Sequence, residues 1–276
     1  MAVTIADLDW QDDSQLLYSI VVSNYSWLMS VTVVEGYKGK ARIADYDISL
    51  PLLKAFDCDV PSTNDIALNG KDVTINPYDF RIPVCSGDIE GTWLNGYAMD
   101  ATEYYLDNLA AYLSEIIGTE IKSTVFAAIL TEGAADAVVE KVTVTAGDGT
   151  AAGALATLHS FVDGLSDEFL DKAYDEGYWN EYIIHISPRT YSLLTQNADL
   201  HSYPVVSGFS VIANSALSGD EMICTPDRNI LVAFDDTVDA NTFRVVSKQE
   251  LSQEIIVGQL AFGGSYRDSE RIAITA

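Results

Sequence analysis

Basic side chains are scarce in this sequence. Its 276 residues include 15 Lys and Arg against 41 Asp and Glu, which gives a net charge of −26. A protein that grips nucleic acid needs clustered Lys and Arg to meet the phosphates. No run of basic residues interleaved with aromatics occurs here, so the composition argues against a protein that grips nucleic acid.

Cysteine is also rare. The chain has 3 cysteines, widely spaced along the sequence: Cys58, Cys85 and Cys224. An odd number at such spacing provides neither a disulfide framework nor a metal-binding quartet, and it suits a reducing compartment.

Targeting and membrane-spanning segments are not evident. The first residues, MAVTIADLDWQDD, carry acids where a secretory signal needs bases, so we expect no export. The apolar run at residues 18–34 contains several Ser, Thr and Asn and is shorter than the ~20 apolar residues that a span requires. We predict buried or interface-bound structure there and no membrane partner.

Familiar catalytic motifs are missing as well. The sequence has no HExxH, CxxC, GxSxG or GxxxxGK[ST] pattern. Of the 3 histidines, His185 lies inside the apolar string YIIHI, which favours a structural role. The Gly147–Thr150 string is typical of a turn and helix N-cap, and Gly263-Gly264 of a bend between strands. We therefore predict a non-enzyme with no cofactor, and we nominate no catalytic, cofactor-binding or metal-binding residue.

An acidic set lies along one predicted helix, and a cation site there is the alternative to a solvated helix face. The spacing favours the solvated face. The set consists of Asp167, Glu168, Asp171, Asp175 and Glu176.

A long helix dominates what is present. The composition, 48% hydrophobic and 20% charged, is that of a folded protein. Residues 100–131 place apolar side chains at the i, i+3, i+4 and i+7 intervals of one helical stripe. Asp100 is the predicted N-cap, Glu103 completes a capping box, and Gly118 is tolerated inside the helix. The predicted stripe is Tyr105, Leu109, Tyr112, Leu113, Ile116, Ile117, Ile121, Val125, Ala128 and Ile129.

Two segments precede this helix. Residues 1–35 form a predicted arm whose apolar residues have no obvious partner nearby in sequence. Residues 36–92 hold four of the 7 prolines and the turn signal Asn69-Gly70, with strands expected at 71–75 and 79–84. This pattern favours a projecting, loop-rich hairpin that contacts something outside its own globule.

Mixed α and β structure follows the helix. Helices are predicted at 150–165, 166–178 and 187–197, the last with Ser187 as cap and Pro188 at its first position. Strands are predicted at 138–145, 182–186, 209–213, 228–234, 243–246, 255–262 and 271–275, and the late ones must pair with something earlier.

Charge is unevenly distributed along the chain. Residues 36–92 hold six bases and nine acids, whereas residues 93–181 hold three bases and sixteen acids. The nearly balanced charge of residues 36–92, beside the acidic residues 93–181, could provide complementary contacts between copies of the chain. The alternative is that the bases scatter this way by chance.

The order of these segments resembles the major capsid proteins of tailed bacteriophages, which have the Hong Kong 97-like fold. The more specific pieces are Ile82-Pro83-Val84-Cys85 through Trp93-Leu94 before the helix, and the strand–Ser-Pro-Arg–helix at 183–194. Gly208-Phe209-Ser210-Val211-Ile212 and Asn229-Ile230-Leu231-Val232-Ala233 then follow as in axial domains of the family. The likeness covers nearly the whole chain.

The resemblance implies an α+β fold with four parts. These are an N-terminal arm (1–35), an extended loop or β-hairpin (36–92), a peripheral domain (93–149 and 235–276, with the spine helix at 100–131) and an axial domain (150–234). The arm is too short for the cleaved scaffolding segment of some members. Lys54 and Lys71 lie in the extended loop, but no asparagine partner is identified, and no cross-linking is predicted.

The resemblance also implies a function. Copies would assemble as pentamers and hexamers into an icosahedral head, a virion component built in the host cytoplasm, which encloses DNA without reading its sequence. Scaffold, portal and decoration proteins are further possible partners. The alternatives are an encapsulin-like shell that stores cargo and, from another class, an acidic α/β enzyme or binding domain. Candidate subunit-contact residues are Trp10, Trp27, Lys38, Lys40, Lys54, Lys71 and Arg81.

Overall fold

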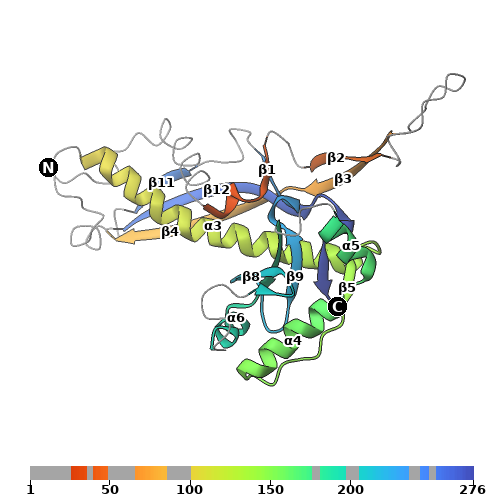
Figure 1. The fold of residues 1–276 in the computed structure, drawn as a ribbon. Coiled ribbons are helices and arrows are strands. Elements are labelled where there is room, and N and C mark those ends of the chain that lie inside the picture. The colour runs from red at the N-terminus through yellow and green to blue at the C-terminus, as the bar shows by residue number, and fades with distance from the viewer. Residues whose placement is uncertain are drawn as a thin grey trace, which may run out of the picture.

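One long helix and a projecting hairpin give the molecule its elongated form (Figure 1). The structure is a computed structural model that describes residues 26–35, 40–48, 66–85, 101–175, 181–196, 205–235, 243–248 and 253–276. Helix α3 (Ala101–Ala135) has 35 residues, which at 1.5 Å per residue makes it about 52 Å long.

The first sheet lies along α3, and its central strand is β12. β12 pairs antiparallel with β10, β11 and β4, and β10 also pairs in parallel with β1. The strands are β1 (Thr32–Val34), β4 (Asn76–Cys85), β10 (Ile230–Phe234), β11 (Phe243–Lys248) and β12 (Gln253–Tyr266).

The second sheet has six strands in the order β5-β13-β9-β6-β8-β7. Its strands are β5 (Glu140–Val142), β6 (Tyr182–Ile186), β7 (Val205–Val206), β8 (Phe209–Ala213), β9 (Met222–Pro226) and β13 (Ala273–Thr275). One face packs on the apolar side of three helices and shares a buried core with them. These are α4 (Ala151–Asp163), α5 (Asp167–Asp175) and α6 (Pro188–Leu194).

A separate two-stranded hairpin is formed by β2 (Lys40–Ile48) and β3 (Ile66–Thr74). Three short 3-10 turns complete the described elements: η2 (Ser26–Met29), η6 (Asp227–Asn229) and η8 (Ser269–Arg271).

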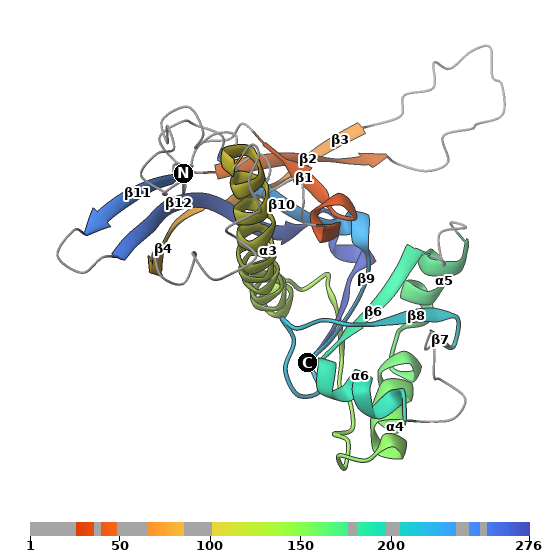
Figure 2. The same ribbon diagram turned by 90° about the vertical axis from the view of Figure 1, so that its left-hand side faces the viewer.

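Helix α3 lies between the two sheets (Figure 2), and this explains its pattern of burial. Ile121, Val125 and Ile129 of the predicted stripe are buried, but Ile116, also in the stripe, is 39% exposed. Phe126 lies outside the predicted stripe and is fully buried, because it packs on the His185 ring of β6 with 5.0 Å between centroids. A helix that is covered on two sides buries residues outside a single apolar stripe, so a prediction based on one stripe names too few buried residues.

Most predicted elements are found where the sequence placed them. The long helix is confirmed and continues four residues past 131, to Ala135; its predicted cap, Asp100, lies outside the described residues. Ser187 accepts from the Thr190 N–H and Pro188 begins α6, as predicted. Thr150 likewise caps α4, so the Gly147–Thr150 string is the turn and N-cap that the sequence indicated. The late strands do pair with earlier ones, β12 with β4 and β13 with β5.

Three sequence interpretations were wrong or incomplete. Asn69-Gly70 is not a turn, because both residues lie inside β3 opposite Asp45 and Ala44. Gly263-Gly264 is not a bend between strands, because both residues lie inside β12 opposite Ala233 and Val232. The sequence analysis also missed β9, whose five residues are all buried in the middle of the second sheet. A strand buried on both faces lacks the alternation by which strands are recognised.

The domain boundaries predicted from the sequence stay a prediction, and three strands pair with strands from a different predicted segment. β10 ends at residue 234, inside the proposed axial segment 150–234, yet it belongs to the first sheet. β13 lies inside the proposed peripheral segment 235–276, yet it belongs to the second sheet. β4 lies inside the proposed extended loop 36–92 but pairs along its whole length with β12.

Candidate assembly surfaces

The β2–β3 hairpin projects from the body of the molecule, away from the end at which β4 and β11 lie (Figure 1). Nine residue pairs hold it together, from Lys40 opposite Thr74 to Ile48 opposite Ile66. At about 3.4 Å per residue, nine antiparallel pairs extend roughly 30 Å. An isolated two-stranded hairpin is marginally stable in water, so this element needs further contacts to keep its form.

The base of the hairpin supplies some of those contacts. Ala41 and Val73 are 0% and 1% exposed, and they pack with Ile75 against Leu231, Ala233 and Ala261 of the first sheet. This small core ties the start of the hairpin to β10 and β12. The remainder of the hairpin extends beyond it.

A charged clamp reinforces the base. The Lys71 ammonium on β3 lies 3.3 Å from Glu132 Oε2 on α3 and 3.0 Å from the centroid of the Tyr266 ring on β12. Partial burial lowers the pKa of Lys71, while the Glu132 carboxylate acts in the opposite direction. An ammonium held over an aromatic face and beside a carboxylate is stabilised by both. We call Lys71, Glu132 and Tyr266 the hairpin clamp.

Hydrogen bonds fix the partners of Lys71. Ser265 Oγ donates to Glu132 Oε2 at 2.6 Å, and the Tyr266 hydroxyl donates to Asp136 Oδ2 at 2.9 Å. Burial and the neighbouring Asp136 carboxylate raise the pKa of the Tyr266 phenol. The clamp therefore joins the hairpin, the end of α3 and the end of β12.

The predicted subunit-contact residues fall into three groups. Trp10, Lys38 and Lys54 lie outside the described residues. Trp27 and Lys71 make contacts inside the subunit: the Trp27 ring packs on Phe126 with 5.8 Å between centroids, and Lys71 is in the hairpin clamp.

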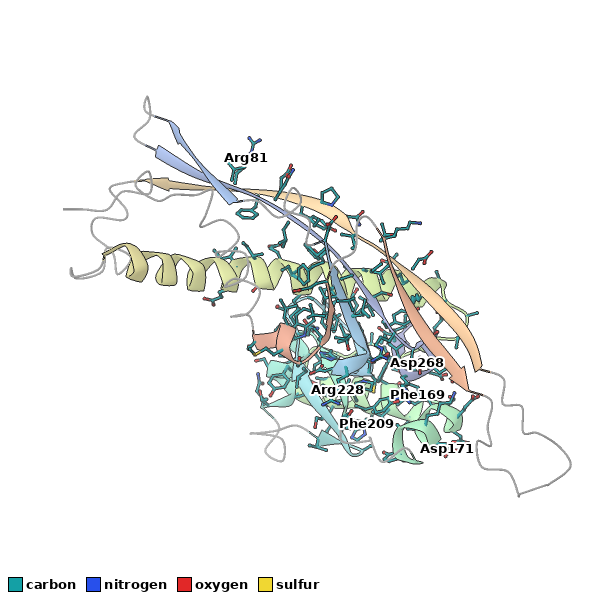
Figure 3. All side chains as sticks on the ribbon, turned by 90° about the horizontal axis from the view of Figure 1, so that it is seen from above. Arg81, Phe169, Asp171, Phe209, Arg228 and Asp268 are labelled. Carbon is teal, nitrogen blue, oxygen red and sulfur yellow. The ribbon has the colours of Figure 1, made fainter. Side chains whose placement is uncertain are left out.

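The third group is exposed. Lys40 begins the hairpin and Arg81 lies on β4 opposite Val257. Figure 3 shows Arg81 pointing away from α3, far from the part that contains Phe169 and Phe209. Among the described candidates, these two are the ones available for contact with another copy.

Three exposed apolar side chains were missed by the sequence analysis. Met29 is 78% exposed, Val138 57% and Val205 49%. Met29 follows Trp27 and Leu28 in η2, so the unpartnered apolar run 18–34 was the signal that could have identified it. Val138 lies in the connection between α3 and β5, and Val205 begins the short strand β7; the sequence does not indicate exposure at either position.

An apolar groove lies between β4, β12 and the outer face of α3. It has a volume of about 320 Å³ and is lined mainly by Tyr78, Phe80, Ile116, Leu260 and Phe262. The Tyr78 and Phe262 rings stack with 4.6 Å between centroids. Asp79 and Glu120 also line it, so its rim is acidic.

Within the described residues, no group of three His, Cys, Asp or Glu could hold a metal ion. A polar hollow of about 360 Å³ lies between the start of α4 and α6, with Asp148, Arg189 and Asp220 on its walls. The Asp148 carboxylate there already accepts from the Thr150 N–H and hydroxyl. Among the helices that the structure describes, none has an apolar stretch long enough to cross a membrane.

Comparison with known proteins gives no match in sequence and clear matches in structure. No family model matches the chain, and neither does any curated protein. A chain of the satellite phage P4 procapsid, solved with its size determination (Sid) protein, is 10% identical with a TM-score of 0.65. The match covers 95% of this chain and 90% of that one.

Two further solved structures match over a similar extent. The virus-like particle from Pyrococcus furiosus is 13% identical with a TM-score of 0.56, covering 97% of this chain and 99% of that one. The mature capsid of bacteriophage PhiM1 is 9% identical with a TM-score of 0.55, covering 90% and 86%. The chain therefore has the Hong Kong 97-like fold of these particles, and the predicted α+β class is confirmed.

Proposed function

We propose that this chain is the structural subunit of an icosahedral bacteriophage head, whose copies form pentamers and hexamers in a shell around the viral DNA. The observation that carries the proposal is the projecting hairpin on a Hong Kong 97-like body. Its nine pairs extend from a base that is held by Ala41, Val73 and the hairpin clamp. A two-stranded element of that length is stabilised when it packs on another subunit.

The geometry suggests how contacts between copies would form. The hairpin leaves the body at one end of the long sheet, while β4 and the exposed Arg81 lie toward the other. A hairpin on one copy that reaches a different surface on the next makes a head-to-tail contact, and such contacts close into rings when the rotation permits. In this proposal the arm (1–35) and extended loop (36–92) reach neighbours, and the axial parts (150–234) meet around the symmetry axes.

The net charge of −26 is compatible with a shell that contains DNA. A strongly acidic wall repels the phosphates of packaged DNA, so the genome does not adhere to it. Scaffold, portal and decoration proteins would be additional partners.

A cargo-storing shell of the encapsulin type is the second candidate. It is favoured by the match to the Pyrococcus furiosus particle, which covers nearly all of both chains. The phage head is placed first because the procapsid of satellite phage P4 gives the higher TM-score, 0.65 against 0.56.

Negative-stain electron microscopy and mass photometry of the purified full chain test the proposal. We expect closed shells or free pentamers and hexamers. The matched variant replaces residues 45–69 with Asn-Gly, which joins the paired residues Ala44 and Gly70 by a two-residue hairpin turn. Because the buried base and Lys71 are retained, this variant should fold as a subunit but fail to assemble.

The outcomes separate the candidates. Uniform shells that co-purify with one enzyme would favour the cargo-storing shell over the phage head. A monodisperse monomer at high concentration, or a truncated variant that assembles like the full chain, would refute the role given to the hairpin.

A further inference from the structure

The second sheet has two different faces. Ile184, Ile186, Met222 and Cys224 point into the core shared with α4, α5 and α6. The residues between them on β6 and β9, His185 and Ile223, alternate to the other face, which meets α3. His185 and Ile223 are opposite each other in the pairing of these strands, and both are 0% exposed.

His185 is an ionisable group buried where this sheet meets the long helix. Its ring packs against Phe126 of α3 with 5.0 Å between centroids. Neither ring nitrogen has a hydrogen-bond partner among the described residues. A buried polar group without a partner is costly, and a charged one more so.

Two charged groups face the imidazole from the elements packed around it. Asp227 of η6 places Oδ1 3.5 Å from His185 Nε2, longer than an ordinary hydrogen bond. Lys122 of α3 acts on it as a like charge if the ring protonates. Lys122 also lies over the Trp27 ring of η2, 5.8 Å from its centroid. The neighbouring strands contribute apolar Ile212 and Ile223.

We propose that His185 is a proton-sensitive element at the junction of the second sheet and α3, which holds the junction closed when neutral and loosens it when protonated. Charging the ring at this fully buried site is costly because neither nitrogen has a hydrogen-bond partner among the described residues, and Asp227 at the edge of the cluster is the group toward which the charged ring would move. The step is a simple proton uptake from solvent. It concerns the subunit itself and does not depend on the proposed shell.

The direction of the effect follows from linkage. Burial lowers the pKa of His185 below its ordinary value of 6.5, Asp227 opposes that shift, and Lys122 adds to it. The open or unfolded state therefore binds more protons than the closed state below about pH 6.5. The opening equilibrium constant should rise by up to tenfold for each pH unit, until the pH falls below the lowered pKa.

Hydrogen exchange of the full chain, corrected for the intrinsic pH dependence of amide exchange, measures this opening. Between pH 7.5 and 4.5 we expect the amides of β6, β9 and the middle of α3 to lose protection by up to tenfold per pH unit. His185→Gln, a neutral replacement, should remove the dependence. His159→Gln, which changes an exposed histidine of α4, should leave it intact.

Two further measurements keep the test decisive if His185→Gln does not fold. In the unmodified chain, NMR titration of the His185 ring should give a pKa below 6.5, with the other two histidines assigned by His159→Gln and His201→Gln. Asp227→Asn, which removes the carboxylate that opposes the lowered His185 pKa of the closed state, should extend the loss of protection to lower pH and make the total loss larger. A His185 pKa at or above 6.5, or equal acid sensitivity in His185→Gln, would overturn the proposal.

Discussion

Gly264 of β12 lies directly against Val125 of α3, and no larger residue fits between them. A Cβ placed on Gly264 would lie 2.7 Å from the Val125 Cα, which is closer than two such carbons approach in proteins. Its neighbour Gly263 has the same relationship to the hairpin base, since a Cβ there would lie 2.1 Å from the Thr74 carbonyl oxygen. The two glycines thus set the spacing between strand, helix and hairpin.

Gly264→Ala should destabilise the subunit. The obstructing atoms include the α3 backbone, so either the helix or β12 must shift, and overpacking of this kind costs about 1–3 kcal/mol. Urea unfolding followed by circular dichroism measures the loss. Gly219→Asn is the control, because Gly219 has open space around it and a φ of 56° that Asn tolerates. Equal stability of Gly264→Ala and the unmodified chain would show that the contact relaxes.

The hairpin clamp should give a measurable coupling between Lys71 and Glu132. Their side chains are 28% and 36% exposed, so the pair is partly screened and we expect a coupling free energy of about 1 kcal/mol. A double-mutant cycle of Lys71→Met and Glu132→Gln, read by urea unfolding, measures it. Met supplies an unbranched apolar side chain in place of Lys71 and removes the charge.

The pair Lys172 and Glu168 offers a matched control for that cycle. It has the same 3.3 Å separation, but Glu168 is 82% exposed, and exposed i,i+4 pairs contribute about 0.3–0.5 kcal/mol. A coupling for Lys71 and Glu132 no larger than this control would mean that the clamp does not stabilise the hairpin base.

Sequence was sufficient for elements whose signals are local. The cap Ser187 and the proline after it mark the start of α6, and the apolar string YIIHI marks β6, with no need of tertiary information. The order of segments also indicated the Hong Kong 97-like fold.

What depends on tertiary contact could not be predicted. Asn69-Gly70 has the composition of a turn, yet pairing across the hairpin places it inside β3, because long-range pairing overrides local turn preference. The assignment of Lys71 to contacts between subunits did not anticipate its pairing with Glu132, which lies 61 residues away in sequence. The periodicity of apolar residues in a sequence gives no information about contacts between residues so far apart along the chain.

Cys224 should be inert to alkylation in the folded chain. It is fully buried in β9, and burial raises the pKa of its thiol well above the ordinary range, so almost no thiolate is present. Because reagent reaches it only through unfolding, native labelling by iodoacetamide should be about a thousandfold or more slower than labelling in urea. Peptide mapping by mass spectrometry gives the rate at this cysteine. Native labelling as fast as in urea would place the strand at an accessible edge.

Charge reversal at Arg81 tests whether the outer side of β4 contacts another copy. Arg81 is exposed and points away from the body (Figure 3), so Arg81→Glu should change the free energy of unfolding by no more than about 0.5 kcal/mol. On an acidic chain with few bases, the same change should weaken a contact with a neighbouring copy and reduce the fraction of protein in assemblies. Sedimentation velocity at low and high salt measures that fraction, and salt should diminish the difference because it screens surface charge.

Arg267→Glu separates a specific contact from a general effect of charge. Arg267 is also exposed but follows the other end of β12, and its replacement changes the net charge by the same amount. If both variants lose assembly equally, the effect belongs to total charge and Arg81 has no special position. If Arg81→Glu loses assembly and Arg267→Glu does not, Arg81 lies in a contact between copies. The same loss in Lys40→Glu, at the start of the hairpin, would place Lys40 in such a contact as well.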